Sequence, residues 1–174
     1  MRVIGLKYWL FGIILIPSFL LSQRTEKYNG LYEKYYKAEE LYAHLQYGAA
    51  KKEFRDFINT CNNPNDPLYQ KALYYEGVSA LELYNSDAIP LLMEYNRVYP
   101  ENIHRSLISF RIGRYFFNDE TYDDAQLWFE ELTAADLDAK YREEYHFKLG
   151  YSALQNENKE LAIKSFRENL KGKS

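Results

Sequence analysis

Beyond residue 30, apolar and polar positions alternate with the three- to four-residue spacing of amphipathic helices. Leu31, Tyr35, Ala38 and Tyr42, for example, fall along one helical stripe. Residues 8–21 are different, because they are uncharged and almost continuously apolar. The pattern therefore predicts a series of amphipathic helices preceded by one short apolar segment.

Capping residues and prolines mark several of the expected helix boundaries. Asp66 stands directly before Pro67, which is an N-cap followed by a proline in the first helical position. Thr121 and Asp124 resemble a capping box at the start of another helix. Pro90 falls in the first turn of an expected helix, where its missing N–H would have no helical partner, so we expect it to be tolerated.

One motif recurs four times, an alanine followed four residues later by a large apolar residue. The alanines are spaced by 38, 37 and 37 residues, and a small residue precedes each of them by 11 or 12 residues. The small residues are Ala38, Gly77, Gly113 and Gly150, and the pairs are Ala50 with Phe54, Ala88 with Leu92, Ala125 with Phe129, and Ala162 with Phe166. Small residues let two antiparallel helices approach closely, and the large residue fills the gap one turn further on. Each recurrence therefore predicts two helices packed small against large.

This pattern resembles the tetratricopeptide repeat (TPR) family over about residues 31–171. The third repeat carries the family's signature positions, at Ile112, Gly113, Phe116, Tyr122, Ala125 and Phe129. The chain departs from the family in its longer period, about 37 residues and not about 34, and in lacking the signature tryptophan. The resemblance implies an all-α fold, an α-solenoid of about four TPR-like helix-turn-helix repeats wound into a right-handed superhelix. The expected repeats are at about 31–66, 67–101, 102–137 and 138–171.

Composition and charge exclude several other classes of protein. The chain has 22 Lys and Arg against 25 Asp and Glu, a net charge of −3, so nothing indicates a nucleic-acid partner. Its 18 Tyr and 10 Phe against 8 Gly and 5 Pro favour helices packed through aromatic side chains. Cys61 is the single cysteine, which excludes a disulfide within the chain and a cysteine-based metal site.

The sequence contains no recognisable catalytic, cofactor or metal motif. His44, His104 and His146 are isolated from one another and from Cys61 at metal-ligand spacings. The acidic run 118–125 lacks the glycine and the distant glutamate of a calcium loop, and helix capping explains it better. We therefore expect no enzyme, no cofactor and no metal. The alternative is an enzyme or small-ligand-binding protein on a helical-repeat frame, with acidic and tyrosine side chains of a groove as its working groups.

The TPR resemblance also implies a binding groove, because in that family the first helices line the concave surface. The corresponding positions here are Tyr32, Tyr35, Tyr42, Lys71, Tyr74, Val78, Phe110, Arg114, Phe117, Glu144, Phe147 and Tyr151. Tyrosine and arginine dominate binding hot spots, so an extended peptide or a partner helix is the expected ligand. The Lys/Asn clamp of chaperone-tail-binding TPR proteins is absent. The competing interpretation is that many of these aromatic side chains pack against neighbouring helices of the same chain.

These features together predict a non-enzymatic protein–protein interaction scaffold or adaptor. The chain resembles the N-terminal part of long multi-TPR cell-envelope proteins of Gram-negative bacteria, which implies a periplasmic or outer-membrane-associated location. The fourth repeat is not followed by a polar capping element, and residues 172–174 are expected to be a frayed tail. Self-association through this end and continuation of the repeats in a longer chain both remain open.

The apolar segment near the N-terminus predicts export. Arg2 and Lys7 precede the apolar segment, and Pro17 interrupts it near its end. The segment is also shorter than a membrane-spanning helix, which needs about 20 apolar residues. This order predicts a signal peptide over residues 1–22, followed by a linker over residues 23–30. The alternative is an uncleaved helix that anchors the scaffold in the inner membrane, which would be the protein's contact with lipid.

N-terminal sequencing of the exported protein tests the signal peptide. Cleavage after Ser22, the small residue that follows the apolar segment, leaves Gln23 as the first residue. An intact Met1 would contradict cleavage and favour the membrane anchor.

Overall fold

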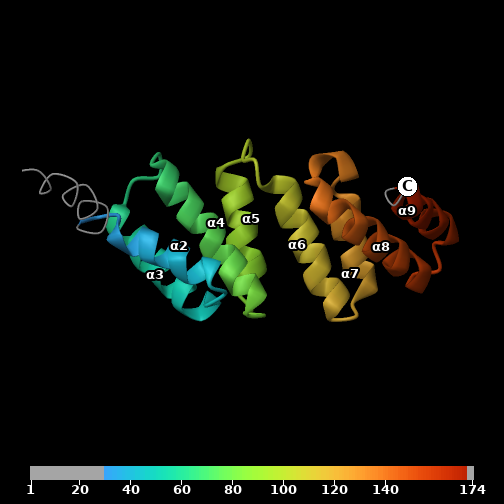
Figure 1. The fold of residues 1–174 in the computed structure, drawn as a ribbon, viewed down its shortest axis with the longest axis horizontal. Coiled ribbons are helices and arrows are strands. Elements are labelled where there is room, and N and C mark those ends of the chain that lie inside the picture. Colours follow the sequence, from blue (N-terminus) through green and yellow to red (C-terminus); the bar gives the residue numbers. More distant parts are fainter. Residues whose placement is uncertain (1–29, 172–174) are drawn as a thin grey trace, which may run out of the picture. The chain divides into compact units, whose positions relative to one another are not determined.

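The computed structural model describes residues 30–171, and their regular structure is entirely helical (Figure 1). The elements are α2 (Glu33–Ala43), α3 (Tyr47–Cys61), α4 (Pro67–Glu82), α5 (Ala88–Val98), α6 (Arg105–Asn118), α7 (Tyr122–Glu130), the short 3-10 helix η1 (Ala134–Asp136), α8 (Ala139–Gln155) and α9 (Lys159–Lys171). The expected signal peptide, most of the linker and the expected tail lie outside the described residues. The all-α prediction is confirmed for the described part of the chain.

The chain divides into two compact units, one up to Ala72 and one from Leu73 onward, so the boundary falls within α4. In the first unit α2 packs against α3. The buried Tyr35 ring lies 5.9 Å from the ring of Phe54 and 5.5 Å from that of Phe57, and the buried Ala38 belongs to the same core. Aromatic rings of α2 and α3 thus pack against each other in the core of this unit.

In the second unit, a glycine lies at each close approach between paired helices. A Cβ added at Gly113 of α6 would lie 2.7 Å from Phe129 of α7, and one added at Gly150 of α8 would lie 2.8 Å from Phe166 of α9. Gly77 of α4 meets Leu92 of α5 in the same way, at 2.7 Å. Real Cβ atoms do not come this close to another carbon atom, so the large side chain occupies the space that glycine leaves open.

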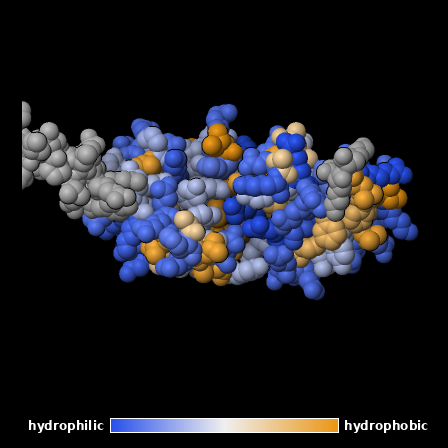
Figure 2. All heavy atoms as spheres, in the orientation of Figure 1, coloured by the Kyte–Doolittle hydropathy of each residue, from blue (hydrophilic) through white to orange (hydrophobic). Residues whose placement is uncertain are grey.

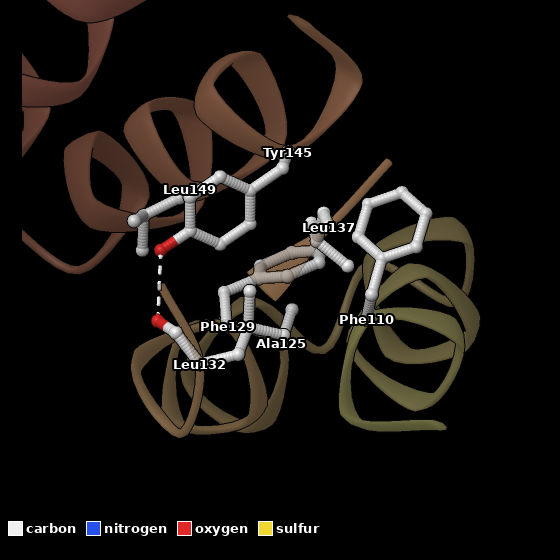
Figure 3. Close-up of a cluster of buried hydrophobic side chains, with 7 residues drawn as sticks. All are labelled: Phe110, Ala125, Phe129, Leu132, Leu137, Tyr145 and Leu149. Atoms are coloured by element: carbon white, nitrogen blue, oxygen red, sulfur yellow. Dashed lines mark hydrogen bonds between the residues drawn. The ribbon is translucent and has the colours of Figure 1, made fainter. Parts of the chain in front are cut away.

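One core cluster joins α6, α7 and α8, and Figure 3 shows its side chains meeting between the three helices. Its members are Phe110, Ala125, Phe129, Leu132, Leu137, Tyr145 and Leu149. The ring of Phe129 lies 6.1 Å from that of Phe110 and 6.0 Å from that of Tyr145. The Tyr145 hydroxyl donates to the backbone carbonyl of Leu132 at 3.2 Å, so its buried oxygen is paired. Packing therefore continues from one helix to the next through α8.

The four turns that follow α2, α4, α6 and α8 share one geometry. In each, the residue seven positions after the small residue has a positive φ, 60° at Leu45, 55° at Tyr84, 60° at Glu120 and 60° at Glu157. At the third of them the Glu120 N–H donates to the Phe117 carbonyl and the Thr121 N–H to the Phe116 carbonyl, which closes the end of α6. Glycine is the usual residue at such a left-handed position, yet none of the four is a glycine.

Two of the expected features at helix starts are observed. Asp66 does cap α4, because its carboxylate accepts from the Leu68 N–H at 2.8 Å, and α5 accommodates Pro90 in its first turn. Among the described residues, no helix combines the length and apolar character that crossing a lipid bilayer requires.

We expect Glu120→Gly to stabilise the second unit by about 0.5–1 kcal/mol, because glycine adopts the left-handed conformation without a Cβ penalty. The neighbouring Asp119 has an ordinary φ of −87°, so Asp119→Gly should be neutral or destabilising. Urea unfolding followed by circular dichroism measures both free energies. Equal effects of the two glycines would contradict a strained turn.

Candidate functional site

Four of the twelve predicted groove residues are buried and belong to the core. Tyr35, Tyr74, Val78 and Phe110 are each at most 3% exposed. The Tyr74 ring is stacked on His104 with centroids 3.9 Å apart, and the Phe110 ring packs against Tyr141 of α8 at 5.4 Å. These four side chains are therefore packed inside the protein, as the competing interpretation expected, and the prediction that they are exposed is corrected.

In the first unit, Tyr32, Tyr42 and Lys71 retain exposure or partial exposure. Tyr32 donates from its hydroxyl to a carboxylate oxygen of Asp66 at 2.8 Å, a bond that raises the pKa of Tyr32 and lowers that of Asp66. Tyr42 packs edge-on against Tyr47, with centroids 5.5 Å apart. The structure does not bring these three residues into one cluster.

In the second unit, predicted groove residues of α6 and α8 do lie together. Phe117 of α6 meets Tyr151 of α8 with ring centroids 5.5 Å apart, and Tyr122 lies within 5.6 Å of both rings. Arg114, one turn before Phe117 on α6, and Glu144, two turns before Tyr151 on α8, are partly exposed. Phe147 is more exposed, at 48%, and packs on Tyr151 at 6.2 Å.

The structure adds Lys148 to this surface, a residue that the sequence interpretation missed. Its ammonium group lies 4.0 Å from the centre of the Phe117 ring, donates to the Asn118 side-chain carbonyl at 3.1 Å and lies 3.8 Å from a carboxylate oxygen of Glu144. Only 13% of its side chain is exposed. Burial lowers the pKa of Lys148, Glu144 opposes the shift, and the positive charge of Arg114 adds to it.

The end of α4 extends the surface through a charged cluster. One oxygen of Glu82 accepts from Arg111 at 2.9 Å and from Arg114 at 3.0 Å. The Tyr84 ring packs on Tyr115 with centroids 5.1 Å apart. We call this exposed and partly exposed surface the α4–α6–α8 strip. Its members are Glu82, Tyr84, Arg111, Arg114, Tyr115, Phe117, Asn118, Tyr122, Glu144, Lys148 and Tyr151. It is a surface and not a deep pocket, since the hollow beside Glu82 and the two arginines has a volume of about 30 Å³, the space of one water molecule.

A second hollow of about 270 Å³ lies between α7, η1, α8 and α9. Glu130, His146 and Glu168 are among its lining residues. Burial lowers the pKa of His146, and the nearby Glu168 opposes the shift. The volume is slightly below the range of about 300–1,000 Å³ that is usual for small-molecule sites.

The candidate chemical residues of the sequence do not assemble into a site in the described part of the chain. His104 stacks on Tyr74, the Nδ1 of His44 lies 2.8 Å from the Glu40 carbonyl, and His146 lines the second hollow. Cys61 lies 3.9 Å from the Asp66 carboxylate. Within residues 30–171, no three His, Cys, Asp or Glu side chains are grouped so that they could hold a metal ion. The α4–α6–α8 strip, which brings Phe117 and Tyr151 of the predicted groove together, is the candidate site.

Removing the carboxylate at the centre of the charged cluster should destabilise the fold. We expect Glu82→Ala to cost about 1–3 kcal/mol, because Arg111 and Arg114 would then face each other, partly buried, without the shared carboxylate. Glu94→Ala, which removes a pair with the exposed Arg97, is the matched control and should cost no more than about 0.5 kcal/mol. Urea unfolding distinguishes them, and equal losses would show that the cluster is not a stabilising element.

Comparison with protein-family models, with curated protein sequences and with solved structures found no match for this chain.

Proposed function

We propose that this chain is a non-enzymatic protein-binding scaffold of the bacterial cell envelope. In this proposal four TPR-like helix pairs, at about residues 31–66, 67–101, 102–137 and 138–171, form a right-handed superhelix. A peptide or partner helix binds along the α4–α6–α8 strip, on the side that the first helices of TPR repeats turn toward their ligands.

Two recurring features support the repeat assignment. The contacts of Gly77 with Leu92, Gly113 with Phe129 and Gly150 with Phe166 each span 15 or 16 residues. The left-handed turn residue follows each small residue at the same interval of seven. Equivalent contacts at equivalent intervals are what a stack of similar helix pairs produces.

The observation that carries the binding proposal is the pair of cationic groups held among aromatic rings on α6 and α8. Arg114 and Lys148 are fixed by Glu82, Asn118 and the Phe117 ring before any ligand arrives. Preorganised side chains lose little conformational entropy on binding, which favours affinity. Tyrosine and arginine at such a surface also offer large contact area with hydrogen-bonding groups.

Charge indicates what the strip would bind. Its ion pairs involve three cations, Arg111, Arg114 and Lys148, and two carboxylates, Glu82 and Glu144. The Lys148 ammonium group is mostly buried near the positive charge of Arg114, and Glu144 of its own helix lies 3.8 Å away. A ligand carboxylate would add a second anionic partner for this group. The neighbouring Phe117, Tyr122 and Tyr151 rings would cover an apolar side chain of the same ligand. The expected partner is therefore a peptide or helix with an acidic residue next to apolar ones.

The envelope location rests on the N-terminal sequence and on the resemblance to multi-TPR envelope proteins. Residues 8–21 have the order and length of a signal peptide, which supports a periplasmic or outer-membrane-associated protein. The inner-membrane anchor remains the alternative for the same segment.

A random peptide display library selected on the full chain tests the proposed function. We expect the selected peptides to be enriched in Asp or Glu beside apolar residues. Their affinity, measured by isothermal titration calorimetry, should fall about tenfold in Lys148→Met, which keeps the length of the side chain but removes its charge.

Lys140→Met is the matched control, because Lys140 is also on α8 but its side chain is 67% exposed and paired only loosely with Asp138 at 3.9 Å. It should change affinity less than about twofold. Peptides without acidic enrichment, or peptides that bind both variants as tightly as the wild type, would overturn the assignment of the strip.

A further inference from the structure

The packing of α8 onto α6 and α7 shows which positions of a helix pair receive the next helix. Tyr141 of α8 packs on Phe110, Tyr145 on Phe129, and Tyr151 on Phe117. The Asn156 side chain donates to Gln126 at 2.9 Å. Phe110 and Phe129 are fully buried as a result. The receiving face of the α6–α7 pair therefore consists of Phe110, Phe117, Gln126 and Phe129.

The equivalent positions of the α8–α9 pair, 37 residues further on, are Phe147, Leu154, Ile163 and Phe166. All four are large and apolar, and Ile163 replaces the polar Gln126. Phe147 and Leu154 are each 48% exposed and Ile163 is 53% exposed. Leu170, one further turn along α9, is 67% exposed. Figure 2 shows the hydrophobic atoms gathered over these two helices. We call Phe147, Leu154, Ile163, Phe166 and Leu170 the α8–α9 face.

We propose that the α8–α9 face binds the same face of a second copy of this chain, and so forms a symmetric dimer. The face continues an interface that is already built, because its positions are those through which α6 and α7 hold α8. In that interface the occupant is an amphipathic helix that presents apolar side chains about one and two turns apart. Helix α9 offers the same kind of surface, with Ile163, Phe166 and Leu170 at intervals of three and four residues.

The first helix pair among the described residues, α2 and α3, argues against a head-to-tail arrangement. The α8 residues that belong to the core cluster shared with α6 and α7 include Tyr145 and Leu149, both buried. Their equivalents on α2, 112 residues earlier, are Glu33 and Lys37, both exposed and charged. Lys37 is paired with Glu53 at 2.6 Å, and burying this charged surface against the α8–α9 face would remove its groups from water without offering them a polar partner on that face. The α8–α9 face of one copy is therefore best matched by the α8–α9 face of a second copy. Such a self-complementary surface is what a closed two-fold dimer requires.

Charges around the face do not oppose this pairing. The exposed residues of α9 include Lys159, Lys164 and Arg167 together with Glu160, so both signs are present at the border of the apolar patch. Two copies related by a two-fold axis can then meet without a field of one sign repelling them.

Analytical ultracentrifugation of the full chain tests the dimer. We expect the wild type to sediment with twice the monomer mass at micromolar concentrations. Ile163→Asp and Leu170→Asp should each raise the dimer dissociation constant at least about tenfold, because each places a charge in an apolar contact. Both residues are exposed in the monomer, so circular dichroism should show an unchanged helical content.

Leu127→Asp is the matched control, since Leu127 is an equally exposed leucine, 62%, on α7 and outside the α8–α9 face. It should leave the dissociation constant unchanged. A monomeric wild type would overturn the proposal, and would point to a different occupant of the face such as the chain's own N-terminal apolar segment. Association that persists in both aspartate variants, or that Leu127→Asp also weakens, would equally overturn it.

Discussion

The close contact between Gly113 and Phe129 determines how the helices of the second unit are arranged. Because glycine has no side chain, the Phe129 ring can lie where a Cβ would otherwise be, at 2.7 Å from that position. The same ring also lies 6.0 Å from Tyr145 of the next helix. One small residue thus fixes the spacing within a pair and also places the aromatic surface onto which α8 packs. The contact of Gly150 with Phe166 repeats the arrangement between α8 and α9.

The helical class and the packing of small against large residues could be predicted from the sequence, because both depend on short intervals that repeat. The turns could not. Leu45, Tyr84, Glu120 and Glu157 carry no local signal for a left-handed conformation, which normally favours glycine. The helices on both sides are held by the small-residue contacts, so the chain between them has to turn in the space available. Tertiary packing imposes this conformation, and its cost of about 1 kcal/mol is offset by the contacts of the two helices.

The candidate site was harder to predict because the exposure of its side chains also depends on tertiary packing. Tyr74 and Phe110 occupy positions that face ligands in the TPR family, but here His104, at the N-cap of α6, packs on Tyr74, and Tyr141 of α8 packs on Phe110. Lys148 was missed because a lysine on a helix normally extends into solvent. Its role comes from three groups, the Phe117 ring, Asn118 and Glu144, of which two belong to another helix. Spacing along the chain identifies a helix face, whereas the covering of that face depends on residues about 30 positions away.

Phe110 and Phe147 show how strongly exposure depends on the neighbouring helix. They occupy equivalent positions on α6 and α8, yet one is fully buried and the other is half exposed. The difference comes from Tyr141, which packs on Phe110, and not from the phenylalanines themselves. A position that is covered in the α6–α7 pair is therefore exposed in the α8–α9 pair, the last one that the structure describes. In the α4–α6–α8 strip, by contrast, Glu82 of α4 pairs with Arg111 and Arg114 of α6, and Glu144 pairs with Lys148 within α8. Under the two proposals the strip would select its partner by charge and hydrogen bonding, whereas the α8–α9 face would select by apolar shape.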